Sequence, residues 1–142
     1  MISIRPALVQ DVHAICRLDA MLLGSTSRSA NLHRWIAQGE CHVVTQGHQV
    51  CAYAVMNQSF FGQSLVVLLM VDPRNQKQGI GRALLTYLES ICPTEKLFVS
   101  TNLTNKRMQR LLLTAGYTPC GMIDALDPGD PELFYYKKPP HH

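Results

Sequence analysis

Apolar residues follow two different periods along this chain. A continuous apolar run at residues 65–70, LVVLLM, is typical of a buried strand. Residues 49–56 instead alternate, so that every second side chain shares one face of a strand. Farther along, a helical face with intervals of three and four is formed by Ile80, Ala83, Leu84, Tyr87, Leu88 and Ile91. The pattern therefore predicts a chain that contains both strands and helices.

The same reasoning divides the remaining chain into short elements. It predicts seven strands, at residues 2–5, 41–45, 49–56, 65–70, 97–101, 117–124 and 133–137. It predicts four helices, at residues 8–22, 32–36, 80–91 and 105–115, with a turn at 57–62. This order predicts a single α/β domain with a mixed sheet over residues 1–138, followed by a short tail at 139–142.

Composition narrows the class of protein. The chain has 142 residues, 46% of them hydrophobic, with a mean hydropathy of zero, which suits one compact soluble domain. A net charge of +3 is too small to indicate nucleic-acid binding. The sequence has no apolar run of about 18 residues, so we expect neither a membrane span nor a signal peptide.

The five cysteines are scattered and form no Cys-x-x-Cys pair. We interpret them as small buried side chains in a reducing compartment, so we expect a cytoplasmic protein without disulfides. The six histidines show no metal-binding spacing, and we expect no metal. His141 and His142 follow two prolines and are interpreted as part of a tail.

Two glycines, Gly79 and Gly81, lie between the apolar strand and the following helix. The first N–H groups of a helix have no internal acceptor, and glycine removes the side chain that would keep a phosphate away from them. This arrangement predicts an anion site suited to a pyrophosphate. A tight strand-to-helix turn without a ligand would give the same spacing. A dinucleotide fingerprint would need a third glycine where Leu84 stands, and the Gly-Lys-Ser/Thr of a P-loop is absent.

The wider motif, Val-Asp-Pro followed by Gln-x-x-Gly-x-Gly-Arg-Ala-Leu-Leu, resembles the acyl-CoA pyrophosphate loop of the GNAT N-acetyltransferase superfamily. The resemblance extends to the early paired helices, the three-strand meander and the late strand–helix pair. It implies a mixed, mostly antiparallel sheet of about seven strands with about four helices. It also implies a set of acetyl-CoA-binding residues: Leu69, Met70 and Val71 along the pantetheine, Lys77, Gln78, Gly79, Ile80, Gly81 and Arg82 around the pyrophosphate, and Asn105 on the pantetheine arm.

The activity that this resemblance implies is direct transfer of an acetyl group from acetyl-CoA to a primary amine of a small molecule or a protein. Such an enzyme needs acetyl-CoA as cosubstrate and an amine acceptor, and we expect no nucleic-acid or membrane partner and a monomer or homodimer. An alternative is a CoA-binding regulatory or interaction module without turnover. A nicotinamide-nucleotide domain is a third, weaker interpretation.

Two catalytic residues that are common in this family are absent from their usual positions in this chain. Leu112 stands where many relatives have a tyrosine that acts as general acid, and Ser100 stands where a glutamate is common. One of Tyr135 and Tyr136 should face inward by alternation, and Ser100, Thr101 or an ordered water could relay a proton. Of these candidates for proton transfer we prefer Tyr135 and Ser100. A group of acidic residues near the last turn comprises Asp124, Asp127, Asp130 and Glu132, of which Glu132 is the better candidate for contact with a cationic acceptor. Trp35, Phe60 and Phe61 are candidates for an apolar wall of the acceptor site, although Trp35 fits the core equally well.

Overall fold

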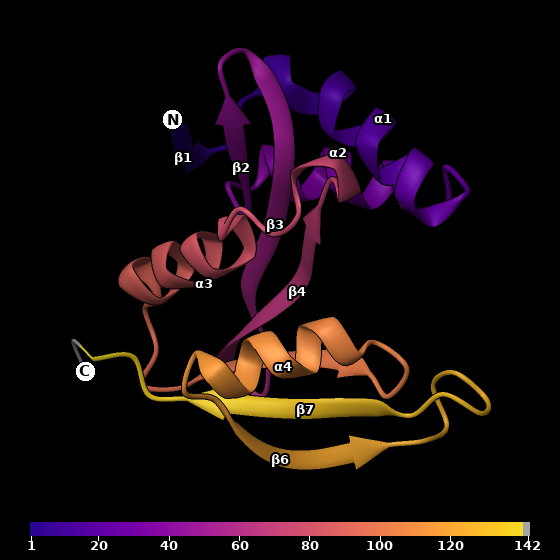
Figure 1. The fold of residues 1–142 in the computed structure, drawn as a ribbon, viewed down its shortest axis with the longest axis vertical. Coiled ribbons are helices and arrows are strands. Elements are labelled where there is room, and N and C mark those ends of the chain that lie inside the picture. Colours follow the sequence, from indigo (N-terminus) through magenta and orange to yellow (C-terminus); the bar gives the residue numbers. More distant parts are fainter. Residues whose placement is uncertain (141–142) are drawn as a thin grey trace. The chain divides into compact units, whose positions relative to one another are not determined.

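A computed structural model describes residues 1–140 (Figure 1). The described chain contains seven strands: β1 (Ile2–Pro6), β2 (Cys41–Gln46), β3 (Gln49–Phe60), β4 (Gln63–Val71), β5 (Leu97–Asn102), β6 (Thr118–Ile123) and β7 (Glu132–Lys137). It also contains four α-helices: α1 (Val12–Leu23), α2 (Ser29–Ala37), α3 (Ile80–Ile91) and α4 (Lys106–Thr114). Two short 3-10 helices are η1 (Val9–Asp11) and η2 (Pro73–Asn75). The predicted position of His141 and His142 in a tail lies outside the described residues.

The strands form one sheet in the order β1-β2-β3-β4-β5-β7-β6. β4 and β5 are parallel, whereas β1 with β2, β2 with β3, β5 with β7, and β6 with β7 are antiparallel. The predicted mixed, mostly antiparallel sheet with four helices is therefore confirmed.

The connection between β3 and β4 is shorter than the sequence suggests. We expected a turn over residues 57–62, but β3 continues to Phe60 and only Phe61 and Gly62 remain as the loop. Both have positive φ, 54° and 80°, the combination that a two-residue type I′ hairpin requires. The polar residues 57–59 resemble a loop in sequence, but the ring of Phe60 packs on Phe98 and Phe134, which keeps the strand in place.

Contacts divide the chain into two compact units. Unit 1 comprises Met1–Met56 and Leu68–Tyr87, and unit 2 comprises Asn57–Val67 and the chain from Leu88 onward. Each unit has its own buried side chains, and the two are described separately below.

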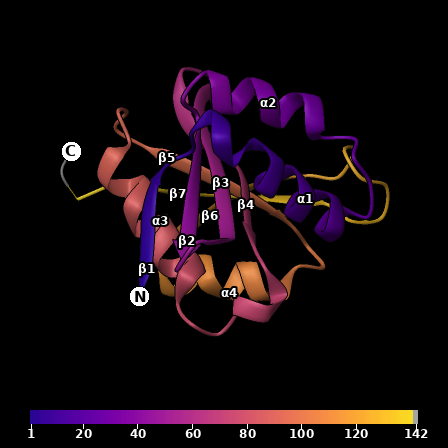
Figure 2. The same cartoon turned by 90° about the horizontal axis from the view of Figure 1, so that it is seen from above.

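In unit 1 the strands β2 and β3 carry helices on both faces. Val43 pairs with Tyr53, and the Tyr53 hydroxyl reaches Asp19 in α1. The neighbouring residue His42 faces the other way, where its Nδ1 lies 3.0 Å from the hydroxyl of Tyr87 in α3. Figures 1 and 2 show α1 and α3 on opposite sides of these strands. Burial lowers the pKa of His42 below its usual value, so the imidazole is held neutral between strand and helix.

Asp19 is the one polar residue on the otherwise apolar face of α1, and it is 2% exposed. It accepts a hydrogen bond of 2.5 Å from the Tyr53 hydroxyl and a bidentate ion pair from Arg28, at 2.7 and 3.2 Å. Burial and this carboxylate together raise the pKa of Tyr53. The buried charge is therefore fully paired, and it ties the chain before α2 to α1 and β3.

In unit 2 the side chains of β5 alternate between two environments. Leu97, Val99 and Thr101 are buried, whereas Phe98, Ser100 and Asn102 are half-buried. Helix α4 covers the buried face: Lys137, opposite Leu97 in the register, donates to the carbonyl of Ala115 at 2.9 Å. Figure 1 shows α4 lying along β7. The half-buried face therefore points away from α4.

Candidate functional site

The loop between β4 and α3 has the geometry of an anion cradle. Lys77 and Gly79 both have positive φ, 69° and 75°. For glycine this conformation has no steric cost, but for lysine it is sparsely populated and typical of functional loops. The two residues turn the chain so that it enters α3 at Ile80, whose side chain is 1% exposed and anchors the loop.

The backbone N–H groups of residues 77–82 indicate that this loop binds a negatively charged ligand. Among the described residues, none of these six groups donates a hydrogen bond to a protein acceptor, although Ala83 N–H already bonds to Gly79 at 3.0 Å. Free N–H groups at a helix start attract anions, and the helix dipole adds to the attraction. The side chains of Lys77 and Arg82 are exposed beside them and form no ion pair within the described chain. This loop therefore fits a pyrophosphate.

Asp72 and Arg74 hold the start of this loop. Asp72 is 2% exposed and accepts hydrogen bonds from the backbone N–H of Arg74 at 3.0 Å and from its guanidinium at 2.7 Å. The N–H of Asp72 in turn donates to the Cys51 carbonyl at 2.8 Å. The Arg74 guanidinium holds the pKa of the Asp72 carboxyl below its usual value, against the opposing effect of burial. Arg74 thus has a structural partner within the loop.

We expect Asp72→Asn to lower the free energy of unfolding at pH 7 by about 1 kcal/mol, because the amide loses the charge-assisted hydrogen bonds that the Asp72 carboxylate accepts from the Arg74 guanidinium. The folded-state pKa of Asp72 lies below its unfolded value, so its contribution is present above that unfolded value and lost as pH falls through the folded one. Urea unfolding of both proteins between pH 7 and pH 2.5 should show the difference shrinking below about pH 4. A difference that stays constant over this range would contradict the assignment.

The predicted pantetheine residues lie on β4 and at the start of α4. Leu69, Met70 and Val71 are half-buried and follow Ser64–Val66, the residues of β4 that pair with β5. In unit 2, Asn105 is the N-cap of α4, and its Oδ1 accepts from the Met108 N–H at 3.1 Å. Its Nδ2 has no acceptor among the described residues, so it remains available as a donor.

The two candidates for proton transfer lie on opposite faces of unit 2. Ser100 is opposite Phe134 on the half-buried face, whereas Tyr135 is opposite Val99 on the face that α4 covers. Tyr135 is 4% exposed, and burial raises its pKa. Leu112 of α4 is fully buried and has a packing role. The pairing of β5 with β7 therefore places Ser100 and Tyr135 on opposite faces, in two different environments.

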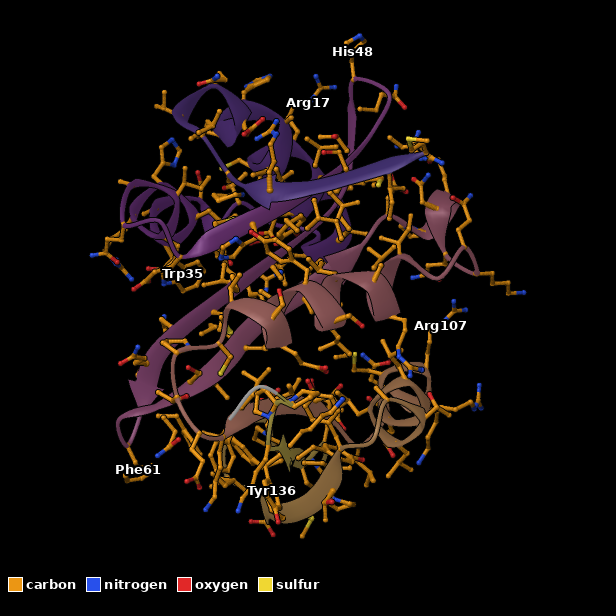
Figure 3. The ribbon with its side chains drawn as sticks, turned by 90° about the vertical axis from the view of Figure 1, so that its left-hand side faces the viewer. Arg17, Trp35, His48, Phe61, Arg107 and Tyr136 are labelled. Carbon is orange, nitrogen blue, oxygen red and sulfur yellow. The ribbon has the colours of Figure 1, made fainter. Side chains whose placement is uncertain are left out.

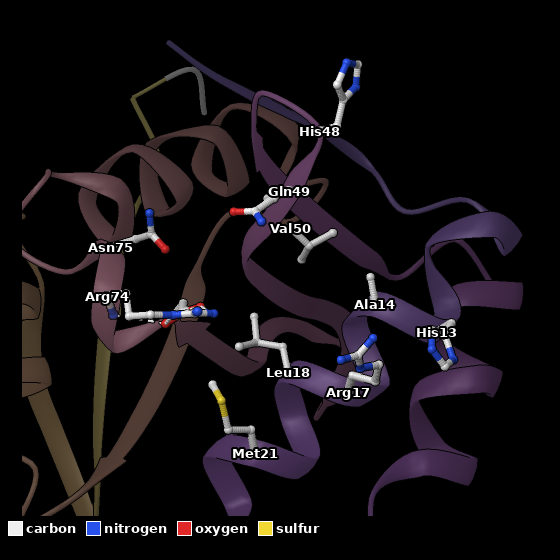
Figure 4. Close-up of a pocket in the computed structure, with 11 residues that line it drawn as sticks. His13, Ala14, Arg17, Leu18, Met21, His48, Gln49, Val50, Arg74 and Asn75 are labelled. Carbon is white, nitrogen blue, oxygen red and sulfur yellow. Dashed lines mark hydrogen bonds and ion pairs between the residues drawn. The ribbon is translucent and has the colours of Figure 1, made fainter.

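Two further sets of residues were not singled out from the sequence. On the half-buried face, Phe98 and Phe134 flank Ser100; the alternation along β5 and β7 was the available signal. In unit 1, a groove of about 560 Å³ lies between α1, the β2–β3 turn and η2, and Figure 4 shows Arg17 and Arg74 directed toward it. Its lining comprises His13, Ala14, Arg17, Leu18, Met21, His48, Gln49, Val50, Asp72, Arg74 and Asn75, and none of residues 77–82.

Comparisons with known proteins agree with this geometry. The family model for the Acetyltransferase (GNAT) family matches residues 11–117. A GNAT-family acetyltransferase from Bacillus cereus ATCC 10987 is 30% identical, with a TM-score of 0.93 and 97% of each chain covered. A Salmonella typhimurium protein solved with its cofactor acetyl-CoA is 21% identical, with a TM-score of 0.83 over 99% of this chain and 95% of its own. The ribosomal-protein-S18-alanine N-acetyltransferase of Escherichia coli is 19% identical, with a TM-score of 0.79 over 98% and 94%. A comparison with curated protein sequences gave no match.

The chain belongs to the GNAT acetyltransferase family, because the family model matches most of its length. This confirms the predicted enzyme class, N-acetyltransferase, and the predicted cosubstrate, acetyl-CoA. Within the described part of the chain, no cluster of three or more His, Cys, Asp or Glu side chains could hold a metal ion. No helix in that part is both long enough and apolar enough to span a membrane.

Proposed function

We propose that this protein transfers an acetyl group from acetyl-CoA directly to a primary amine of a small molecule or a protein. The observation that carries the proposal is the run of six backbone N–H groups at residues 77–82 without acceptors among the described residues. These N–H groups, with the side chains of Lys77 and Arg82, would hold the pyrophosphate. Backbone groups of Leu69, Met70 and Val71 in unit 1 would bind the pantetheine. In unit 2, the Asn105 Nδ2 is a candidate donor to an amide carbonyl.

The bound thioester supplies an activated acetyl carbon. The protein must accept protons from the amine and provide one to the departing sulfur. A new N–C bond forms as the C–S bond breaks, one amine proton passes to the departing sulfur, and another leaves to solvent. An amine with a pKa of about 10.4 is mostly protonated at pH 7, so a proton acceptor on its side of the reaction is needed. A donor on the opposite side would protonate the sulfur.

We assign these two tasks to the two faces of unit 2. Tyr135 lies on the face covered by α4, the helix that begins beside Asn105, and its hydroxyl would donate a proton to the departing sulfur and regain one of those that the amine releases. Ser100 lies on the half-buried face and would relay a proton from the amine. Cytoplasmic location and a monomeric or homodimeric state remain predictions.

A thiol-release assay with acetyl-CoA and a panel of amines and peptides tests the proposal. Release that depends on acceptor and acetyl-CoA would support it. Binding of acetyl-CoA without acceptor-dependent release would instead favour a non-catalytic CoA-binding module, the alternative suggested by Leu112 and Ser100 at positions where many relatives have a tyrosine and a glutamate.

We expect Tyr135→Phe to lower kcat by about 100-fold with little change in the KM for acetyl-CoA, because only the proton donor is removed. Ser100→Ala should lower kcat less, by about tenfold, since water can replace a hydroxyl relay on a half-exposed face. Tyr117→Phe is the control, because Tyr117 is another buried tyrosine of unit 2 and its hydroxyl donates to Glu89 at 2.8 Å. Equal losses of kcat in Tyr135→Phe and Tyr117→Phe would refute the assignment of Tyr135.

A further inference from the structure

The half-buried face of β5 and β7 in unit 2 carries four aromatic rings. The register pairs Phe98 with Tyr136 and Ser100 with Phe134, so these side chains share one face. Phe60 of β3 joins them: its ring lies 5.1 Å from Phe98 and stacks on Phe134 at 5.5 Å with an interplanar angle of 11°. Phe98 and Tyr136 lie 6.0 Å apart. We call Phe60, Phe98, Phe134 and Tyr136 the aromatic face.

The aromatic face is distinct from the hydrophobic core of unit 2. The core uses the opposite side of the same strands, where Leu97 and Val99 are at most 1% exposed. All four rings of the aromatic face keep partial exposure. A contiguous exposed apolar surface is uncommon in a monomer and often marks a ligand site.

The adjoining turn extends this surface. Phe61 is 92% exposed and lies at the tip of the turn (Figure 3). Its ring lies 5.1 Å from that of Phe60. Its φ of 54° is strained for a residue other than glycine or asparagine, and the first turn position favours asparagine. The turn type does not require a bulky ring at this position, which suggests that the ring serves a ligand.

One carboxylate on this face is free for a cation. Glu132 is opposite Asn102 and two residues before Phe134, so it lies on the same side as the rings. Among the described residues it has neither an ion pair nor a side-chain hydrogen bond. Two nearby carboxylates are already used: Asp127 accepts from Asn102 at 3.1 Å, and Asp130 accepts from Thr104 at 2.7 Å. Glu132 is therefore the group available to a bound ammonium.

We propose that the aromatic face and Glu132 select an acceptor amine that carries an aromatic or similarly bulky apolar group near its nitrogen. The rings would cover the apolar part, and Glu132 would attract the ammonium, which aromatic rings also favour. Ser100, between Phe98 and Asn102 on this face, would lie near the nitrogen. This inference rests on the proposed acetyl transfer and adds the substrate class.

The test compares 2-phenylethylamine with n-propylamine as acceptors in the thiol-release assay. We expect kcat/KM to be at least tenfold higher for 2-phenylethylamine, as burial of a ring implies. Phe134→Ala should reduce this ratio at least fivefold, and Phe61→Gly, which cannot disturb the core and relieves the strained turn, should reduce it about twofold. A parallel arm with tripeptides that begin with Phe or Gly distinguishes a protein N-terminus from a small amine as the source of the ring.

Glu132→Gln tests whether the negative charge of Glu132 attracts the acceptor ammonium. It should lower kcat/KM for 2-phenylethylamine about tenfold and leave the KM for acetyl-CoA unchanged. Glu95→Gln is the matched control, because Glu95 is an exposed glutamate of unit 2 outside this face. Saturation-transfer NMR measures binding of both amines without turnover.

The outcomes separate the two proposals. Turnover with equal kcat/KM for the ringed and ring-free acceptors, small amines and peptides alike, overturns the inference alone. Ring-dependent binding without turnover supports the aromatic site and overturns acetyl transfer. Neither turnover nor binding overturns both.

Discussion

Gly79→Val should weaken acetyl-CoA binding about 1,000-fold in a calorimetric titration. Gly79 has a φ of 75°, which a β-branched residue adopts only with strain, so the loop must rearrange and its N–H groups turn away from the phosphates. Hydrogen bonds to a charged group are worth about 1.5–3 kcal/mol each, so the loss of two accounts for the expected change.

The loss of affinity must be separated from backbone strain in general. Gly39 has a nearly identical φ of 74°, and a Cβ at either glycine would meet no atom within 4 Å. Gly39→Val therefore introduces the same strain at the end of α2, away from the loop. We expect it to lower thermal stability about as much as Gly79→Val while its Kd for acetyl-CoA stays within threefold of the wild-type value. Similar affinities for the two variants would exclude residues 77–82 as the phosphate site.

Asp19→Ala should lower the free energy of unfolding by about 3–5 kcal/mol in urea denaturation. The substitution leaves the Tyr53 hydroxyl without its acceptor inside the protein and removes both contacts of Arg28. Such a loss is a large share of the stability of a typical domain.

Two variants locate the source of this loss. Tyr53→Phe removes one hydrogen bond but keeps the ion pair, so we expect a smaller loss of about 1–2 kcal/mol. Asp124→Ala removes an exposed carboxylate and should change stability by less than about 0.5 kcal/mol. If Asp19→Ala were no more destabilising than Asp124→Ala, the buried cluster would have no role in stability.

Elements defined by local patterns were predicted well from the sequence. The face of α3 follows from apolar spacing alone, and the loop before it follows from the two glycines and the helix start, because both signals lie within a few residues. The end of β3 was missed because Phe60 is held by Phe98 and Phe134, which are 38 and 74 residues farther along the chain. Local polarity cannot show such contacts.

Strand register was the other feature that the sequence could not provide. Alternation shows that neighbouring residues of one strand face opposite ways, but not which residues of two strands share a face. A shift of one residue would place Ser100 and Tyr135 together, whereas the structure separates them. Asp19 is similar: its polarity on an apolar helix face was visible, but its partner Tyr53 lies 34 residues away.

The capping role of Asn105 affects the entropy of binding. Its Oδ1 is already fixed by the Met108 N–H in the free protein, so the direction of its Nδ2 is set by the folding of α4. A ligand that accepts from this Nδ2 therefore avoids the cost of immobilising a mobile side chain, about 0.5–1.5 kcal/mol. Folding of the helix thus prepares this donor for binding before any cosubstrate arrives.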